Sequence, residues 1–333
     1  MYYLGIDVHK DDSQVAVLDE GGELVAEQRL ENDQFDELAE AYAGSKATLE
    51  ATGNYFAIYD ALDQHLDVAV ADPRQTKAIG TAEVKNDRLD AKLLAQLCRA
   101  DMVAESYVPA KDVREIRTLA HGRKRLVEKR TDFKNEVHAV LDNQGISYDW
   151  DPFTPSDREK SHEVDLTPIG RTLLESFLAV IDTLNERITE LERMIEETAV
   201  AEEETQRLMT IPGVSFFSSV LIVGEIGEIE RFDRSEELVS YAGLDPVTRE
   251  SGEKRQEGGI SKQGRSALRW ILVQCANVAV NQVKDPYLTR FYARLKRKKN
   301  HQVAIVATAR KMLVSIYYML TRKEVYDPPG VPG

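Results

Sequence analysis

The stretch "YYLGIDVHKDDSQVAVLDEGGELVAEQRL", residues 2–30, decides the fold of the N-terminal part of the chain. It contains three strand-like runs, and the turn sequences "KDD" and "EGG" separate them. Helices and strands alternate after it. The sequence predicts a helix over 35–43, a strand over 46–52, a helix over 55–66 and a strand over 68–73. This order predicts a ribonuclease-H-like α/β sheet, although actin-like ATPases begin in the same way.

Composition limits the class of protein. A chain of 333 residues with 42% hydrophobic and 30% charged residues is typical of a globular protein of two or three domains. No apolar run approaches the roughly 18 residues of a membrane span, and the chain enters a strand without a signal peptide. Cys98 and Cys275 each stand alone, so neither a disulfide framework nor a zinc site is expected. A cytoplasmic protein is the simplest interpretation.

The charge is distributed unevenly. The formal net charge of −14 argues against a generic nucleic-acid binder, which is usually basic. However, residues 111–134 hold nine Lys or Arg against four acids, and residues 285–311 hold eight against one. These two basic islands predict phosphate binding by particular faces. To account for the acidity of the rest of the chain, our hypothesis is a host with high internal salt. The screening length falls to about 3 Å at 1 M salt, and surface carboxylates keep a protein soluble there.

Helical patterns dominate the rest of the chain. A long basic helix is predicted over 111–145, followed by a Pro- and Asp-rich linker at 149–157. Apolar residues then follow at alternating steps of three and four, which predicts a coiled coil or a helical hairpin, with self-association favoured. The residues of this seam are Leu174, Phe177, Ile181, Leu184, Ile188, Leu191 and Ile195.

The segment 208–227 places Pro-Gly-Val between two apolar runs. This pattern predicts a helix-hairpin-helix, whose tight turn at Gly213 would present backbone N–H groups to a DNA phosphate. The alternative is an ordinary αα-corner. A polar loop over 245–264 and a return to helix from Ser266 complete the predicted order.

Four acids are candidates for one metal site. Asp7 lies in the first strand and Glu50 closes the fourth, and these strands are neighbours in a ribonuclease-H-like sheet. Asp87 and Asp90 share one face at the start of a helix, with Cβ atoms about 5–6 Å apart. Capping of that helix is the alternative role for these two aspartates. Convergence of four acids instead predicts Mg²⁺, in two ions about 4 Å apart that serve phosphodiester displacement. His9 is expected to be a structural histidine, or else a partner of Asp7.

Several motifs together resemble a known family. "GIDVHK" (5–10), "EATGNY" (50–55) and "KNDRLDAKLLA" (85–95) resemble the DEDD transposases of bacterial and archaeal insertion sequences, which include the pilin-gene invertases. The N-terminal domain of that family resembles the RuvC Holliday-junction resolvase. "IPGVSFFSSVLIVGEIG" (211–227) and "YAGLDPVTRESGEKRQEGGISKQGRSALRWIL" (241–272) resemble its C-terminal transposase domain, so the resemblance covers nearly the whole chain.

The resemblance implies roles for particular residues. Asp7, Glu50, Asp87 and Asp90 would hold Mg²⁺, and Ser251 would attack a DNA phosphodiester to form a covalent phosphoserine link. The residues alone leave Ser251 as an ordinary turn residue before glycine, and Ser261 is a rival nucleophile. The implied partners are DNA, a structured noncoding RNA used by some members, and further copies of the chain in a dimer or tetramer. The acids of one subunit would then act with Ser251 of another.

Candidates for nucleic-acid contact come from three places. These are the two basic islands, the predicted turn at Gly213, and the segment 241–272, which we call the signature segment. The candidate residues are Arg123, Lys124, Arg125, Lys129, Arg130, Gly213, Lys254, Arg255, Lys262, Arg265, Arg269, Lys296, Arg297, Lys298 and Lys299. The expected organisation is a RuvC-like catalytic domain (1–105), a basic helical extension (106–150), a linker and coiled coil (151–205), and a mainly α transposase domain that contains the helix-hairpin-helix and Ser251 (206–325).

Three other functions remain open. A metal-dependent junction nuclease would hydrolyse DNA with water, which would leave Ser251 incidental. An actin-like ATPase or sugar kinase also carries an aspartate on its first strand, but "DVHKDDS" places charged residues where a phosphate-binding turn needs Gly and Ser or Thr. A non-catalytic DNA-binding module would not need four intact acids.

Overall fold

The computed structural model describes residues 1–328 except 52, 74, 77–86, 200–202 and 252–253. Within helices and strands it also leaves the side chains of residues 87–88, 155, 247–251 and 254–258 undescribed. The chain divides into two compact units, Met1–Val108 and Pro109–Gly333. We describe each unit by itself.

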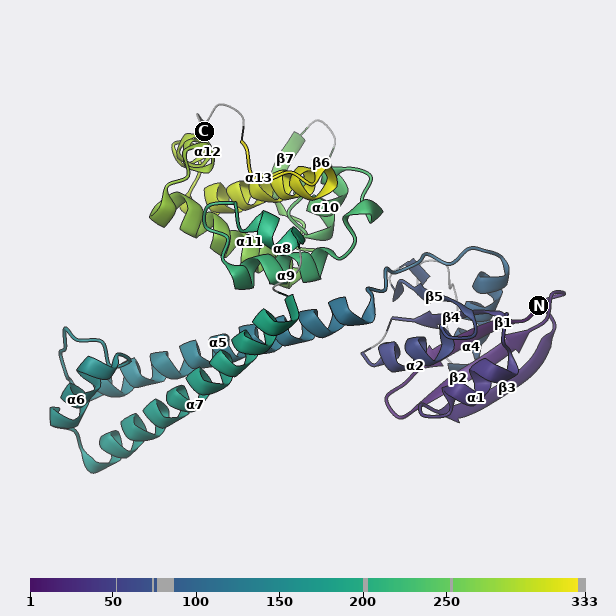
Figure 1. The fold of residues 1–333 in the computed structure, drawn as a ribbon, viewed down its shortest axis with the longest axis horizontal. Coiled ribbons are helices and arrows are strands. Elements are labelled where there is room, and N and C mark those ends of the chain that lie inside the picture. The colour runs from purple at the N-terminus through teal and green to yellow at the C-terminus, as the bar shows by residue number, and fades with distance from the viewer. Residues whose placement is uncertain (52, 74, 77–86, 200–202, 252–253, 329–333) are drawn as a thin grey trace. The chain divides into compact units, whose positions relative to one another are not determined.

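One sheet organises the N-terminal unit (Figure 1). Its strands lie in the order β3-β2-β1-β4-β5, with β1 antiparallel to β2 and parallel to β4. The bounds are β1 (Tyr3–Val8), β2 (Asp12–Leu18), β3 (Leu24–Glu31), β4 (Lys46–Glu50) and β5 (Asp67–Ala71). The predicted mixed α/β sheet is therefore confirmed, including the adjacency of the first and fourth strands.

The two faces of this sheet are covered differently. Leu4, Ile6 and Val8 of β1 share a buried core with Phe35 of α1 (Phe35–Ala41) and Ile58 of α2 (Tyr55–Leu62). Side chains alternate along a strand, so Gly5 faces the other side, where it meets α4 (Asp87–Arg99). A Cβ at Gly5 would lie 2.0 Å from the Ala91 carbonyl oxygen, so only glycine lets α4 approach the sheet this closely.

The C-terminal unit begins with two long helices that lie side by side (Figure 1). These are α5 (Lys111–Asn143) and α7 (Pro168–Ala199), and α6 (Pro155–Glu163) lies between them in sequence. Helix α6 replaces part of the predicted linker, because Thr154 and Pro155 supply the N-cap position and the first helical position. Leu174 and Ile181 of the predicted seam are buried in a cluster with Val137 and Leu141 of α5. The seam is thus packed at least partly within the chain, and a coiled coil between subunits stays a prediction.

The remaining helices form the core of this unit around α13 (His301–Arg322). The others are α8 (Glu203–Leu208), α9 (Phe216–Ile226), η1 (Ile229–Arg231), α10 (Ser235–Tyr241), α11 (Ser266–Val278), η2 (Ala279–Val283) and α12 (Pro286–Lys296). By length and composition α13 could cross a membrane, but more than half of its apolar window is buried among these helices. It is the core helix of a mostly helical unit.

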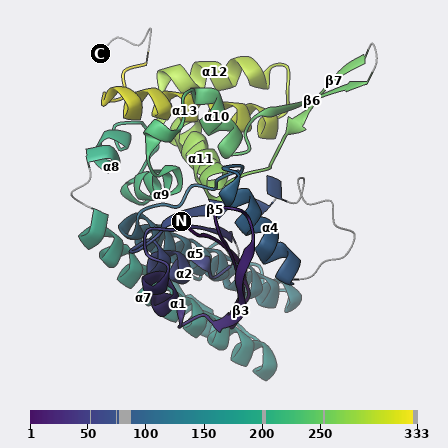
Figure 2. The same cartoon turned by 90° about the vertical axis from the view of Figure 1, so that its right-hand side faces the viewer.

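A β-hairpin stands where the sequence predicted a polar loop. Strands β6 (Pro246–Ser251) and β7 (Lys254–Ile260) pair antiparallel, and Figure 2 shows them extending beyond the helices of the same unit. Gly213, in the predicted helix-hairpin-helix, has φ +93°. A Cβ there would lie 2.7 Å from the Ala279 nitrogen, so internal packing accounts for this glycine. The helix-hairpin-helix itself stays a prediction.

Candidate active site

Two of the predicted acids occupy equivalent positions on neighbouring strands. The paired register of β1 and β4 runs to Ile6 and Leu49, and Asp7 and Glu50 are the next residues of each strand. Residues at the same register of parallel strands face the same side of a sheet. Asp7 and Glu50 therefore face the side that Gly5 presents to α4.

Helix α4 runs antiparallel to these strands. Near its end, the Nζ of Lys46, the first residue of β4, lies 3.9 Å from an Asp101 carboxylate oxygen. Further along the sheet, Gly5 contacts the backbone of Ala95 and Ala91. Two strand residues beyond Gly5 advance about 6.6 Å, which corresponds to about four helical residues. This spacing predicts that the first turn of α4, which contains Asp87 and Asp90, lies near the strand ends that carry Asp7 and Glu50.

The individual carboxylates differ in exposure. Asp7 is only 7% exposed, and its Oδ2 lies 3.5 Å from Nε2 of His9, whereas Glu50 and Asp90 are half-buried. The Asp87 side chain lies outside the described residues. Among the side chains that the structure describes, no three acids, histidines or cysteines gather closely enough to hold a metal. Asp7 and Glu50 are thus at neighbouring positions, but the complete ligand set is not defined.

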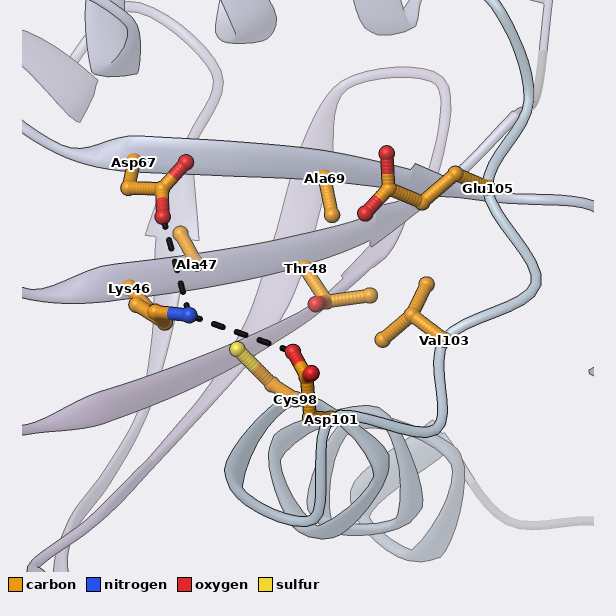
Figure 3. Close-up of a pocket in the computed structure, with 9 residues that line it drawn as sticks. All are labelled: Lys46, Ala47, Thr48, Asp67, Ala69, Cys98, Asp101, Val103 and Glu105. Carbon is orange, nitrogen blue, oxygen red and sulfur yellow. Dashed lines mark ion pairs between the residues drawn. The ribbon is translucent and has the colours of Figure 1, made fainter.

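A polar hollow lies at the other end of α4 (Figure 3). It has a volume of about 160 Å³, and Thr48, Cys98 and Glu105 contribute to its lining. Inside it, Lys46 Nζ lies 3.8 Å from Asp67 and 3.9 Å from Asp101. Because Lys46 begins β4 and Glu50 ends it, this hollow is separate from the acidic strand ends.

The chemistry of the donors suits a hard divalent cation. A buried carboxylate is costly unless it is paired or bound to a metal, and Mg²⁺ prefers carboxylate oxygens. Asp7, Glu50 and Asp90 carry only such oxygens, and they belong to β1, β4 and α4. The chemistry of these donors is compatible with a divalent cation.

The second predicted centre lies on the hairpin of the C-terminal unit. Ser251 is the last residue of β6 and pairs with Lys254 of β7, but its side chain is not described. The rival serine, Ser261, lies at the base of the hairpin, where its Oγ donates a hydrogen bond of 2.6 Å to Asp245 Oδ1. This contact gives Ser261 a structural role.

Backbone hydrogen bonds connect two loops at the base of the β6–β7 hairpin. The Lys262 nitrogen donates to the Gly243 carbonyl oxygen at 3.2 Å, and the Arg265 nitrogen donates to the Tyr241 carbonyl oxygen at 2.9 Å. Gly264 has φ +139°, and a Cβ there would lie 2.3 Å from the same Tyr241 oxygen. The signature segment that resembles the transposase domain thus builds a tightly packed support for the strands that carry Ser251.

Comparisons with known proteins match the segments of the chain that contain the two predicted centres. A family described as "Transposase" and designated DEDD_Tnp_IS110 matches residues 4–145, and the "Transposase IS116/IS110/IS902 family" matches residues 205–293. The "Transposase for insertion sequence element IS1111A" of Coxiella burnetii is 28% identical over 97% of this chain and 90% of that protein. The chain belongs to the DEDD-type insertion-sequence transposases.

Two further relatives support the same assignment. The "Probable family 20 transposase" of Pseudomonas aeruginosa is 25% identical over 98% of each chain. The "Transposase for insertion sequence element IS1328" of Yersinia enterocolitica is 25% identical over 84% of each. This chain is therefore an enzyme that acts on DNA, and its relatives match it across both compact units.

The transposase contains a buried ionic centre that the sequence did not reveal. Glu225 of α9 is 0% exposed, and its carboxylate accepts a hydrogen bond of 2.7 Å from Arg265 Nε and contacts His121 Nε2. Arg117 of α5 donates to the Gly224 carbonyl oxygen at 2.9 Å. Burial would raise the pKa of Glu225, but the His121 hydrogen bond and the Arg265 charge outweigh it and lower the pKa to about 2. Glu225 therefore links the hairpin base to α5.

We expect Glu225→Gln to destabilise the C-terminal unit by about 3–5 kcal/mol, because breaking a buried ion pair leaves uncompensated charges. The measurement is chemical denaturation of the full chain at neutral pH. Since the folded pKa of Glu225 is about 2 and its ordinary value is 4.5, the carboxylate stabilises the fold above about pH 4.5. This contribution is lost as the pH falls from there toward 2.

The matched control for this prediction is Glu230→Gln, which changes an exposed acid on η1. Its effect should stay within about 0.5 kcal/mol. Equal unfolding free energies for the Glu225 and Glu230 variants, or an unchanged acid profile in Glu225→Gln, would contradict the structural role of the buried centre.

The predicted nucleic-acid contacts divide into two groups. Some side chains are already engaged within the transposase: Arg123 with Glu192, Lys124 with Glu128 and the Trp270 ring, Arg130 with Asn185, Arg265 with Glu225, and Arg269 with the Ala242 carbonyl oxygen. The others whose side chains are described lie exposed, although Lys129 also pairs with Asp132 at 3.1 Å and Lys296 lies over the Tyr292 ring. The exposed side chains are Arg125, Lys129, Lys262, Lys296, Arg297, Lys298 and Lys299. The side chains of Lys254 and Arg255 are not described. The exposed group is the better candidate for binding phosphates.

Proposed function

We propose that this transposase excises and inserts its own element by phosphodiester transfer through Ser251. The observation that carries the proposal is the placement of Asp7 and Glu50 at adjacent strand ends, on the face that receives the start of α4. The four acids Asp7, Glu50, Asp87 and Asp90 would hold Mg²⁺. When bound, Mg²⁺ supplies stabilisation of the charge that develops on the phosphoryl group.

The proposed step transfers a DNA phosphate to the protein. The Ser251 hydroxyl oxygen forms a bond to phosphorus, and the bond from phosphorus to a deoxyribose oxygen breaks. The serine proton passes to solvent, and the released deoxyribose oxygen takes up a proton as a hydroxyl. A serine hydroxyl is a weak nucleophile, so it requires activation by its surroundings. Reversal of this step by another DNA hydroxyl would complete strand exchange.

One assay separates this function from a junction nuclease that uses water. The purified transposase is incubated with Mg²⁺ and end-labelled DNA that carries the ends of its element, and the products are run on a denaturing gel. We expect labelled DNA that is covalently attached to protein and is released by protease. Cleaved DNA ends that carry no protein would favour the nuclease instead.

The partners that we propose are DNA, further copies of the chain and a structured noncoding RNA. Exposed apolar residues on α7 support self-association into a dimer or tetramer, since Ile169 is 76% exposed and Leu173 and Met194 are also exposed. Exposed Arg125 and Lys129 on α5 suit an RNA that is recognised through its phosphates. Sequencing the nucleic acid that co-purifies with the protein tests the RNA proposal. Its setting would be the cytoplasm, at the nucleoid.

A further inference from the structure

Two carboxamides hold the turn that follows the Asp7 strand. Asn54 Nδ2 donates hydrogen bonds to the carbonyl oxygens of His9 and Lys10, at 3.0 and 3.1 Å. Asn32 Nδ2 donates to the same two oxygens, at 3.0 and 3.2 Å. The turn between β1 and β2 is therefore fixed by two side chains that make the same pair of contacts.

The two asparagines come from different parts of the sheet. Asn32 directly follows β3, whereas Asn54 lies four residues after Glu50, at the end of β4. Strand β4 lies beside β1, and β3 lies beyond β2 on the opposite side. Of these two side chains, it is therefore Asn54 that ties the end of β1 to the end of β4, which are the two strand ends that carry Asp7 and Glu50.

The side chain of Asn54 is not used for helix capping. Asn54 occupies the N-cap position of α2, where an asparagine side chain ordinarily accepts a hydrogen bond from the first helical turn. In this chain it makes no such bond, and its amide nitrogen instead contacts the His9–Lys10 turn. The paired register of β1 and β4 ends at Ile6 and Leu49, so this contact continues the link between the strands beyond their last paired residues.

We propose that Asn54 is a positioning residue that sets the separation of the Asp7 and Glu50 carboxylates. The inference rests on the proposed role of these acids in holding Mg²⁺. A side chain that fixes the backbone beside two ligands organises them before a cation arrives, so its loss should weaken binding of the cation without removing any ligand.

The test is thermal unfolding of the full chain during a Mg²⁺ titration, which measures binding without relying on catalysis. For Asn54→Ala we expect the Mg²⁺ concentration for half-maximal stabilisation to rise at least about tenfold, the usual scale for loss of such a supporting contact. Asn32→Ala is the matched control, because it removes hydrogen bonds to the same carbonyl oxygens and an additional one from Ser13. It should leave the half-maximal concentration within about twofold, because the link between β1 and β4 remains.

A second variant separates positioning from charge. Asn54→Asp keeps the size of the side chain but replaces its amide donor with a carboxylate. If residue 54 acted only through charge, this extra negative charge would lower the Mg²⁺ concentration required. Positioning predicts the opposite, a rise similar to that of Asn54→Ala. Circular dichroism at high Mg²⁺ checks that each variant folds.

The outcomes distinguish this inference from the proposed function. Three results together support the inference. Mg²⁺ stabilises the wild type, Asp7→Asn removes this stabilisation, and the half-maximal Mg²⁺ concentration rises in Asn54→Ala but not in Asn32→Ala. The role of Asn54 alone is overturned if Mg²⁺ stabilises the wild type but the half-maximal Mg²⁺ concentration shifts equally in Asn54→Ala and Asn32→Ala. The same holds if this concentration does not shift in Asn54→Ala. A wild-type protein that Mg²⁺ does not stabilise overturns the proposed metal role and the inference with it.

Discussion

Replacing Ser251 with alanine is expected to abolish the covalent protein–DNA adduct and to lower strand transfer at least about a thousandfold, because the nucleophile is removed. Ser251 ends β6 and pairs with Lys254 in the hairpin, and alanine can occupy the same strand position. The fold and the affinity for DNA should therefore be retained. The measurement is the fraction of end-labelled DNA bound to protein on a denaturing gel.

Ser261→Ala is the matched control for this variant. Ser261 Oγ is committed to Asp245 at the hairpin base, so its loss should weaken the support without removing the nucleophile. We expect this variant to form the adduct, although more slowly. An adduct that persists in Ser251→Ala and disappears in Ser261→Ala would transfer the nucleophilic role to Ser261.

The N-terminal sheet could be predicted because its information is local. The strands at 2–8, 13–19 and 23–30 have apolar runs bounded by turn residues, and the structure contains β1, β2 and β3 at nearly the same positions. The neighbouring positions of Asp7 and Glu50 followed from the strand order alone. The residue-by-residue pairing of β1 with β4 and the close approach of α4 over Gly5 could be seen only in the structure.

The hairpin and the ionic centre of the transposase unit could not be predicted in the same way. Strands β6 and β7 consist mainly of polar and charged residues, so they lack the apolar alternation that marks a half-buried strand. Glu225 meets His121 and Arg265 at separations of 104 and 40 residues along the chain. The only local signal was an acid inside an apolar helix, which indicates that a partner is needed but does not identify it.

Helix α7 shows a different limit. Its heptad seam correctly indicated a long helix with one apolar face, but periodicity does not specify which partner covers that face. Helix α5 covers Leu174 and Ile181 within the chain. The basic residues of α5 were predicted from their charge alone to bind phosphates. In the structure, Arg123 and Arg130 instead contact residues of α7.

Asp7→Asn is expected to lower Mg²⁺-dependent DNA cleavage at least about a hundredfold. Stabilisation by metal ions is worth several kcal/mol, and each 1.36 kcal/mol of barrier is about a factor of ten in rate. Asp7 is 7% exposed, and its Oδ2 lies 3.5 Å from Nε2 of His9. Added Mg²⁺ should raise the melting temperature of the wild type but not that of Asp7→Asn, because the carboxamide removes a charged oxygen ligand.

The matched control for Asp7→Asn is Asp101→Asn, which neutralises an acid at the opposite end of α4. Asp101 has φ +55°, a conformation that asparagine tolerates, and its carboxylate lies 3.9 Å from Lys46 Nζ. Cleavage rate and Mg²⁺ stabilisation should stay near wild type in this variant, because the acidic strand ends are unchanged. Similar losses in both variants would mean that general negative charge, rather than the Asp7 position, supports the reaction. Wild-type cleavage by Asp7→Asn would exclude the acids at these strand ends from the chemistry.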